Sequence, residues 1–215
     1  MAPYAVLYMA LLRDVPAPAN PEKGVVFLAA AHDVSSLNVV VRNSAKEILR
    51  FSARSVAVSL QPGKMVKAGV NQDVQYCVYG LKNDSGTTAV LAASESYPVR
   101  YAGYYLKQML ELAVGAGPRV LNISDDAVAP KVDGGSPSLT TLIVEAQTPE
   151  KSDQLVQLKA DLDETRNIAC MNLEKMMERG QQLDDILKRS DDLSAASKLF
   201  LKEAKKTRCR FCAVM

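Results

Sequence analysis

The last residues carry the most specific chemistry in this chain of 215 residues. Cys212 is followed by two aliphatic residues and a terminal Met215, which matches the C-a-a-X pattern for prenylation. In that reaction the thiol takes an isoprenoid chain, and a terminal methionine favours farnesyl. Prenylation takes place in the cytosol, so the pattern argues against secretion and against structural disulfides. We therefore expect a farnesyl anchor on Cys212.

The residues before Cys212 suggest a second membrane signal. A single prenyl chain anchors weakly, and stable attachment needs another lipid or a basic segment. Cys209 is a candidate for a second lipid. Each basic side chain near an anionic leaflet would add about 1 kcal/mol. The basic residues of this segment, opposed only by Glu203, are Lys198, Lys202, Lys205, Lys206, Arg208 and Arg210.

Upstream of the tail, one set of positions repeats in alternating steps of three and four residues. This 3.5-residue period is typical of a coiled-coil seam. A single helix from Leu155 to Thr207 would be roughly 80 Å long at about 1.5 Å per residue, so it needs partner helices to pack against. The seam positions are Leu155, Leu158, Leu162, Thr165, Ala169, Asn172, Met176, Arg179, Leu183, Ile186, Ser190, Leu193, Ser197, Phe200, Ala204 and Thr207.

Arg179 stands in the middle of this apolar seam. A guanidinium has five donors and a charge that it does not lose. Two copies in a parallel homodimer would bury two like charges, whereas a hetero-assembly could supply acceptor oxygens and set the register. The pattern therefore favours partner helices, and a homodimeric coiled coil remains the alternative.

The residues before the seam predict a domain of mixed helices and strands. All ten prolines lie at or before Pro149, so the chain divides near that residue. Ser44 and Glu47 match a capping box at the start of a helix that Pro62 and Gly63 end. A second helix begins near Pro98, and residues 138–147 fit either a strand or a short helix. Apolar runs predict five strands at 4–12, 25–31, 64–70, 74–81 and 87–93. The expected class is α+β, with an antiparallel sheet.

Enzymes, cofactor sites and nucleic-acid binding are not expected. Gly63-Lys64 is the only candidate for a phosphate loop, but Val58 stands where the first glycine belongs and Met65 replaces the hydroxyl. His32 is the sole histidine and has no neighbouring nucleophile in the sequence. The net charge of +2 is too small to indicate a nucleic-acid partner. We predict neither a metal nor a cofactor other than the covalent lipid.

The string from Met176 to Ile186 resembles the centre of the R-SNARE motif. The segments Leu162-Asp163-Glu164-Thr165 and Ser197-Lys198-Leu199-Phe200 extend the match. The resemblance implies that Arg179 is the zero-layer arginine of a parallel four-helix bundle, where it meets one glutamine from each of three Q-SNARE helices. The other seam positions become the layers of that bundle.

The residues before the seam resemble a longin (profilin-like) domain. The matching strings are Asp33-Val34-Ser35-Ser36, Arg42-Asn43-Ser44 and Tyr97-Pro98-Val99-Arg100. Together with the prenylated ending, they place the chain near the lipid-anchored longin R-SNAREs, with a five-stranded antiparallel sheet, flanking helices and a long SNARE helix. We divide the chain into a longin domain (1–137), a linker (138–150), the R-SNARE motif (151–210) and a prenylation tail (211–215).

This resemblance implies a role in vesicle fusion at the cytosolic face of endomembranes. It also implies that the SNARE motif can fold back on an apolar groove of the longin domain. Phe51 is the main candidate for the groove, with Ile48, Leu49 and Val56 beside it on the same predicted helix. The alternative function is a lipid-anchored coiled-coil adaptor or tether that does not promote fusion.

Overall fold

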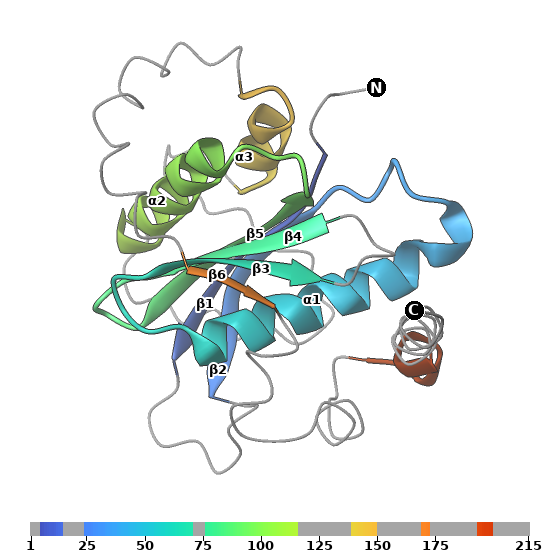
Figure 1. Cartoon of the computed structure of the whole chain (residues 1–215), viewed down its shortest axis with the longest axis horizontal. Coiled ribbons are helices and arrows are strands. Elements are labelled where there is room, and N and C mark those ends of the chain that lie inside the picture. Colours follow the sequence, from blue (N-terminus) through green and yellow to red (C-terminus); the bar gives the residue numbers. More distant parts are fainter. Residues whose placement is uncertain are drawn as a thin grey trace, which may run out of the picture.

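A computed structural model describes residues 5–14, 24–70, 76–115, 139–149, 169–172 and 193–199. The chain alternates strands and helices in the order ββαβββαα, and a short strand follows from the C-terminal half (Figure 1). A short helix at residues 195–199 is also described. The elements are β1 (Val6–Asp14), β2 (Val25–His32), the 3-10 turn η2 (Val39–Val41), α1 (Arg42–Ser59), β3 (Met65–Val70), β4 (Tyr76–Lys82), β5 (Thr87–Ser94), α2 (Val99–Gly115), α3 (Leu139–Ala146) and β6 (Ala169–Asn172).

The sheet has the strand order β2-β1-β5-β4-β3-β6. The first five strands in this order pair antiparallel, and β6 joins β3 in parallel. Helix α1 covers one face of the sheet, and α2 and α3 cover the other (Figure 1). The antiparallel sheet of five strands with flanking helices confirms the predicted fold class, to which β6 adds a sixth strand.

The burial of β1 on both faces of the sheet explains its continuous apolar sequence. Side chains alternate between the two faces of a strand, and both faces of this sheet are covered. Ala10 and Leu12 belong to the apolar cluster beneath α1, whereas Met9 and Leu11 belong to the cluster beneath α2 and α3. A strand buried on both faces needs apolar residues at every position.

Helix α1 lies close to β4 at Gly80. A Cβ atom at this position would lie 2.6 Å from Leu60 Cδ1 and 2.7 Å from Val56 Cγ1. The missing side chain therefore lets the end of α1 approach the sheet, and Val56 and Leu60 fill the space in the core.

The predicted capping box at Ser44 is wrong. Helix α1 begins at Arg42, after the turn η2, and its capping residue Val41 makes no side-chain hydrogen bond. The Arg42 side chain turns back instead, donating from Nε to the Leu37 carbonyl (3.0 Å) and from Nη2 to the Ser35 carbonyl (2.8 Å). Hydrogen bonds to the preceding loop thus accompany a helix start three residues before the one that the capping box predicts.

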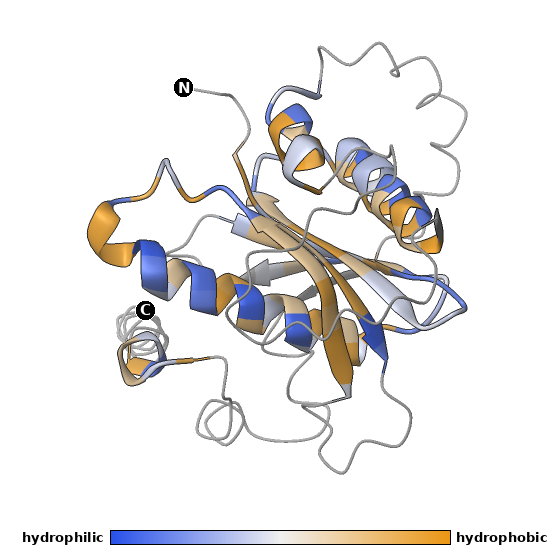
Figure 2. Ribbon diagram, turned by 180° about the vertical axis from the view of Figure 1, so that it is seen from behind, coloured by the Kyte–Doolittle hydropathy of each residue, from blue (hydrophilic) through white to orange (hydrophobic). Residues whose placement is uncertain are grey.

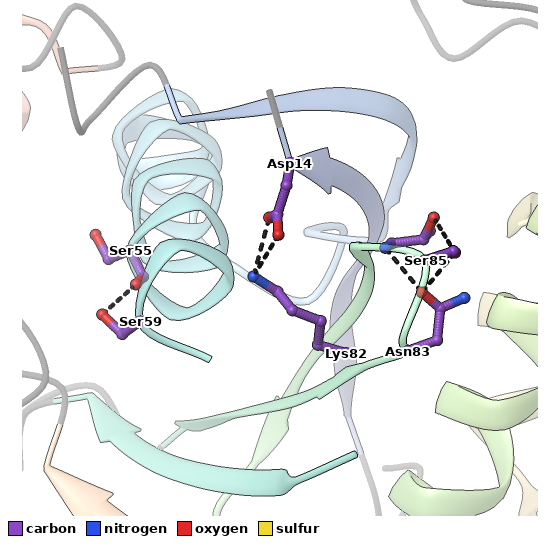
Figure 3. Close-up of polar contacts among 7 residues, drawn as sticks. Asp14, Ser55, Ser59, Lys82, Asn83 and Ser85 are labelled. Carbon is purple, nitrogen blue, oxygen red and sulfur yellow. Dashed lines mark hydrogen bonds and ion pairs between the residues drawn. The ribbon is translucent and has the colours of Figure 1, made fainter. Parts of the chain in front are cut away.

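An ion pair and an Asn-centred turn order the end of the sheet where β1, β4 and β5 meet (Figure 3). The buried Lys82 Nζ lies 2.9 Å from Asp14 Oδ1 and 3.1 Å from Oδ2. In the β4–β5 turn, Asn83 Oδ1 accepts hydrogen bonds from Thr87 N and Ser85 Oγ, both at 2.8 Å. These contacts hold the ends of three strands together.

Helix α3 lies within residues 138–150, which the sequence suggested as a linker. Its Leu139, Leu142 and Ile143 side chains are buried in the cluster beneath α2. Just after the helix, Gln147 accepts a hydrogen bond from Val6 N (2.9 Å) and donates to Val6 O (2.8 Å). Because α3 contributes to the core and is bonded to β1, we propose that the longin domain extends to residue 149.

Candidate functional site: a contact between the two halves of the chain

The structure places four of the predicted seam positions and all four predicted groove residues. We define the SNARE segment as residues 151–210. The structure describes four of its seam positions: Ala169, Asn172, Leu193 and Ser197. The groove residues Phe51, Ile48, Leu49 and Val56 are all buried on α1. The assignments that lie outside the described residues are Arg179, Cys209, Cys212, Leu155, Leu158, Leu162, Thr165, Met176, Leu183, Ile186, Ser190, Phe200, Ala204 and Thr207.

Residues Ala169–Asn172 form strand β6, so the expectation of a continuous helix does not hold for them. They pair in parallel with β3, with Ala169 opposite Val66 and Asn172 opposite Gly69. Without β6, β3 would be an edge strand with a row of unpaired backbone groups. The pairing satisfies those groups, and it gives Ala169 and Asn172 a contact that their seam positions did not predict.

Leu193 joins the two halves through apolar packing. Its side chain is only 5% exposed and belongs to the cluster beneath α1, together with Phe51, Ile48 and Leu49. Ala169 packs against the same cluster and is partly buried. The predicted groove residues and two seam residues thus share one apolar core.

Glu47 adds a polar contact beside this core. Its Oε2 accepts a hydrogen bond from Ser194 N at 2.8 Å. Ser194 Oγ in turn accepts from Ser197 N at 3.3 Å, so it caps the helix at residues 195–199. Figure 1 shows this short helix, in red, beside the N-terminal part of α1. The carboxylate therefore meets the amino end of a helix, where negative charge is favourable.

The hydrogen bonds also change the acidity of Glu47. Partial burial alone would raise the pKa of its carboxyl group, because burial penalises the charged form. The bonds from the Ser194 backbone and from the Ser197 and Ser194 hydroxyls outweigh that effect and lower the pKa. The ionised form of Glu47 is thus the form that holds the two segments together.

Two parts of this site had only weak signals in the sequence. Glu47 fitted a capping box, and nothing local pointed to a partner 147 positions away. The β6 strand left a trace, because Ile168 to Met171 form an unbroken apolar run between two asparagines. Such a run fits a short strand as well as a helix, and the longer 3.5-residue period obscured it.

The described residues offer little for other kinds of site. Among them, no group of three or more His, Cys, Asp or Glu side chains could hold a metal ion. Cys77, the cysteine of β4, is buried. No helix in the described part of the chain combines the length and the apolar character that crossing a membrane requires.

Comparison with known proteins finds relatives that match both halves of the chain. Residues 154–214 match the Synaptobrevin family model. The VAMP-like protein YKT61 of Arabidopsis thaliana is 33% identical over 200 residues, which cover 92% of this chain and 93% of the relative. The synaptobrevin homolog ykt6 of Schizosaccharomyces pombe is 31% identical over 192 residues, which cover 86% and 89%.

A third relative, the synaptobrevin homolog YKT6 of Saccharomyces cerevisiae, is 28% identical over 187 residues, which cover 84% of this chain and 88% of the relative. These similarities extend through both the domain and the SNARE segment. The chain therefore belongs to the YKT6 family of synaptobrevin homologues, which are prenylated, non-enzymatic R-SNAREs with an N-terminal longin domain.

Proposed function

We propose that this chain pairs with three Q-SNARE helices and thereby drives the fusion of intracellular vesicles. A role in vesicle fusion is implied by the family. In this proposal Arg179 forms the zero layer of the bundle, and the other seam residues form the layers on either side. Farnesyl on Cys212, with a second lipid on Cys209, holds the protein on the cytosolic face of endomembranes.

We further propose that the longin domain inhibits assembly of the bundle. The supporting observation is the burial of Leu193 in the core beneath α1. A side chain that occupies this core cannot at the same time face the centre of a four-helix bundle. Ala169 and Asn172 are under the same restriction, because a backbone in a strand cannot also be in a helix. The closed chain must open before its seam is available.

Mixing the purified full chain with three Q-SNARE helices tests both proposals. We expect a stable four-helix complex, detected by its resistance to detergent and by a rise in helical circular dichroism. Glu47→Ala should form the complex a few-fold faster, because it weakens the closed contact without touching the seam. Glu111→Ala removes an exposed carboxylate from α2, and it should assemble at the rate of the wild type.

The variant Arg179→Leu tests the role of the zero layer separately from that of the other seam positions. We expect a folded chain whose complex loses its fixed register or stoichiometry, because a buried polar group often gives specificity rather than stability. A complex with unchanged register, stoichiometry and fusion kinetics would contradict the role of Arg179. A stable homodimer without any mixed complex would favour the adaptor function. Equal rates of complex formation for wild type and Glu47→Ala would contradict inhibition by the domain. They would not contradict the proposal that the chain forms a four-helix bundle.

A further inference from the structure

The turn before α1 displays three consecutive valines to solvent. Val39 and Val40 are 72% and 85% exposed, and Val41 is also exposed. We call residues Val39–Val41 the valine tip. Single exposed apolar residues are common on protein surfaces and need no explanation. Three consecutive exposed valines at one turn form a contiguous apolar patch. Exposed apolar patches often mark an interaction site.

Hydrogen bonds hold the valine tip in this exposed position. Asn38 Oδ1 accepts from Val40 N at 3.2 Å, which closes the turn. On the other side of the tip, the Arg42 guanidinium donates to the carbonyls of Ser35 and Leu37. The polar groups around the tip are therefore engaged within the loop, while the valine side chains point outward.

Basic residues continue from the valine tip along α1. Arg42, Lys46, Arg50 and Arg54 follow one another at four-residue spacing, which places them on one side of a helix. We call these four residues the basic stripe. In Figure 2 the turn and α1 show this order, an orange turn followed by a helix with repeated blue segments. All four side chains are partly exposed.

The basic stripe lies on a different side of α1 from the contact with the SNARE segment. Arg50 and Arg54 turn toward β2, where their guanidinium carbons lie 4.8 and 5.1 Å from the centre of the Phe27 ring. Glu47, the one acidic residue of α1, is engaged by Ser194. The nearby Asp33 is engaged by Ser35 and by Gln147. The four basic side chains outnumber the carboxylates of Glu47 and Asp33, so the local charge of this face is positive.

We propose that the valine tip and the basic stripe form a second membrane contact, which binds the surface of an anionic bilayer. An apolar edge beside basic side chains is the pattern of segments that lie in the membrane interface. The valines would enter the headgroup layer, and the stripe would face the anionic lipids of the cytoplasmic leaflet. A lipid anchor keeps the domain at high local concentration near the membrane, so a weak contact is enough to orient it.

A single tryptophan can report this contact, because the chain has none of its own. Val40→Trp places an indole in the tip, and Val114→Trp places one at a valine of α2 that is 73% exposed. Each full-length variant carries a C-terminal histidine tag and is bound to vesicles through a nickel-chelating lipid. This tether replaces the prenyl group, so the result does not depend on the proposed lipidation.

The vesicles contain brominated phosphatidylcholine, either alone or mixed with phosphatidylserine. We expect strong quenching and a blue shift for the indole at position 40 on the anionic vesicles, and little quenching for the indole at position 114. Adding Lys46→Glu to Val40→Trp should lower the bound population of the tip at least fivefold, since each basic residue contributes about that factor. Lys107→Glu, on α2, is the matched control and should have no effect.

The controls test the contribution of the valine tip and that of the basic stripe separately. Quenching at position 40 that is no greater than at position 114 would overturn the proposal. Equal quenching on neutral and anionic vesicles, or no change with Lys46→Glu, would overturn the role of the basic stripe. Rising salt should weaken the quenching on anionic vesicles, because salt screens exposed charges. Since all variants share the same tether and the same C-terminal basic segment, a difference between them reports the substituted positions and not the attachment to the vesicle.

Discussion

At the residue scale, Glu47 connects the electrostatics of the domain to the position of the SNARE segment. One oxygen accepts the Ser194 N–H, and the carboxylate lies at the amino end of the helix at residues 195–199. The contact needs the negative charge, because hydrogen bonds to a carboxylate are stronger than those to a neutral acid. A single proton on Glu47 can therefore weaken the closed arrangement.

The pH dependence of the closed contact follows from the lowered pKa of Glu47. Its ordinary value is 4.5, and the serine hydrogen bonds lower it in the closed chain. The contribution of Glu47 is thus complete above pH 4.5 and is lost as the pH falls through the lowered pKa. We expect Ser197→Ala to raise the pKa of Glu47, as measured by NMR titration of its carboxyl carbon. An unchanged pKa in Ser197→Ala would contradict this contact.

The Lys82–Asp14 pair makes a second prediction at this scale. Lys82 is buried, whereas Asp14 is about half exposed. Asp14→Ala leaves a buried ammonium group without its carboxylate, and we expect a loss of about 1–3 kcal/mol in the free energy of unfolding. Lys82→Met removes the charge and keeps the apolar stem, so its cost should be smaller. Urea unfolding of both variants gives the comparison, and a larger loss for Lys82→Met would contradict the role of the buried charge.

At the scale of elements, β3 provides the strand edge with which β6 of the SNARE segment pairs. It pairs with β4 on one side and with β6 on the other. Four residues make a weak strand by themselves, so β6 depends on further contacts to stay in place. The burial of Leu193 beneath α1 and the Ser194–Glu47 bond provide two such contacts farther along the segment.

Leu193→Ala tests whether these contacts act together. Removing most of a buried leucine costs about 2 kcal/mol or more, which would shift the ratio of closed to open chains about 30-fold. We expect faster hydrogen exchange of the β3 amides that face β6. Leu199→Ala is the matched control, because this leucine of the short helix is 60% exposed. Unchanged hydrogen exchange of the β3 amides in Leu193→Ala would mean that β6 stays paired with β3 without the buried leucine.

At the scale of the whole molecule, our proposal assigns the domain and a lipid tail the control of where the SNARE segment acts. In our proposal a prenyl group attaches the chain to a membrane, and in the structure the longin domain buries Leu193 of the seam in its own core. Opening exposes apolar surface, which costs free energy until partner helices cover it. In this model the chain is restrained until its partners are present.

Cys212→Ser tests the attachment directly. This change removes the thiol that accepts farnesyl, so we expect the protein to become cytosolic in a eukaryotic host. Cys209→Ser should keep the prenyl group and divide between cytosol and membrane, because one lipid anchors weakly. Intact-mass measurement of both variants reports the modification. An unmodified Cys212 in the wild type would contradict the anchor.

Much of the longin domain could be predicted from the sequence, because its signals are local. The apolar runs of the strands and the breaker Pro62-Gly63 depend on neighbours a few residues away. Five predicted strands and two long helices are present, with ends that differ by a few residues. Residues 138–147 were ambiguous, and their burial against α2 settles that Leu139–Ala146 is a helix.

By itself, the sequence determined the class of the protein. The SNARE seam with its central Arg179, the C-a-a-X ending and the longin strings are patterns of spacing, and spacing is visible without coordinates. The positions of Ala169–Asn172 and Leu193 in the fold, in contrast, come from tertiary contacts that no local pattern contains. Ala169–Asn172 is a strand and Leu193 is buried because β3 and α1 offer an unpaired edge and an apolar core. A helix-forming period is a weak preference that such tertiary contacts override.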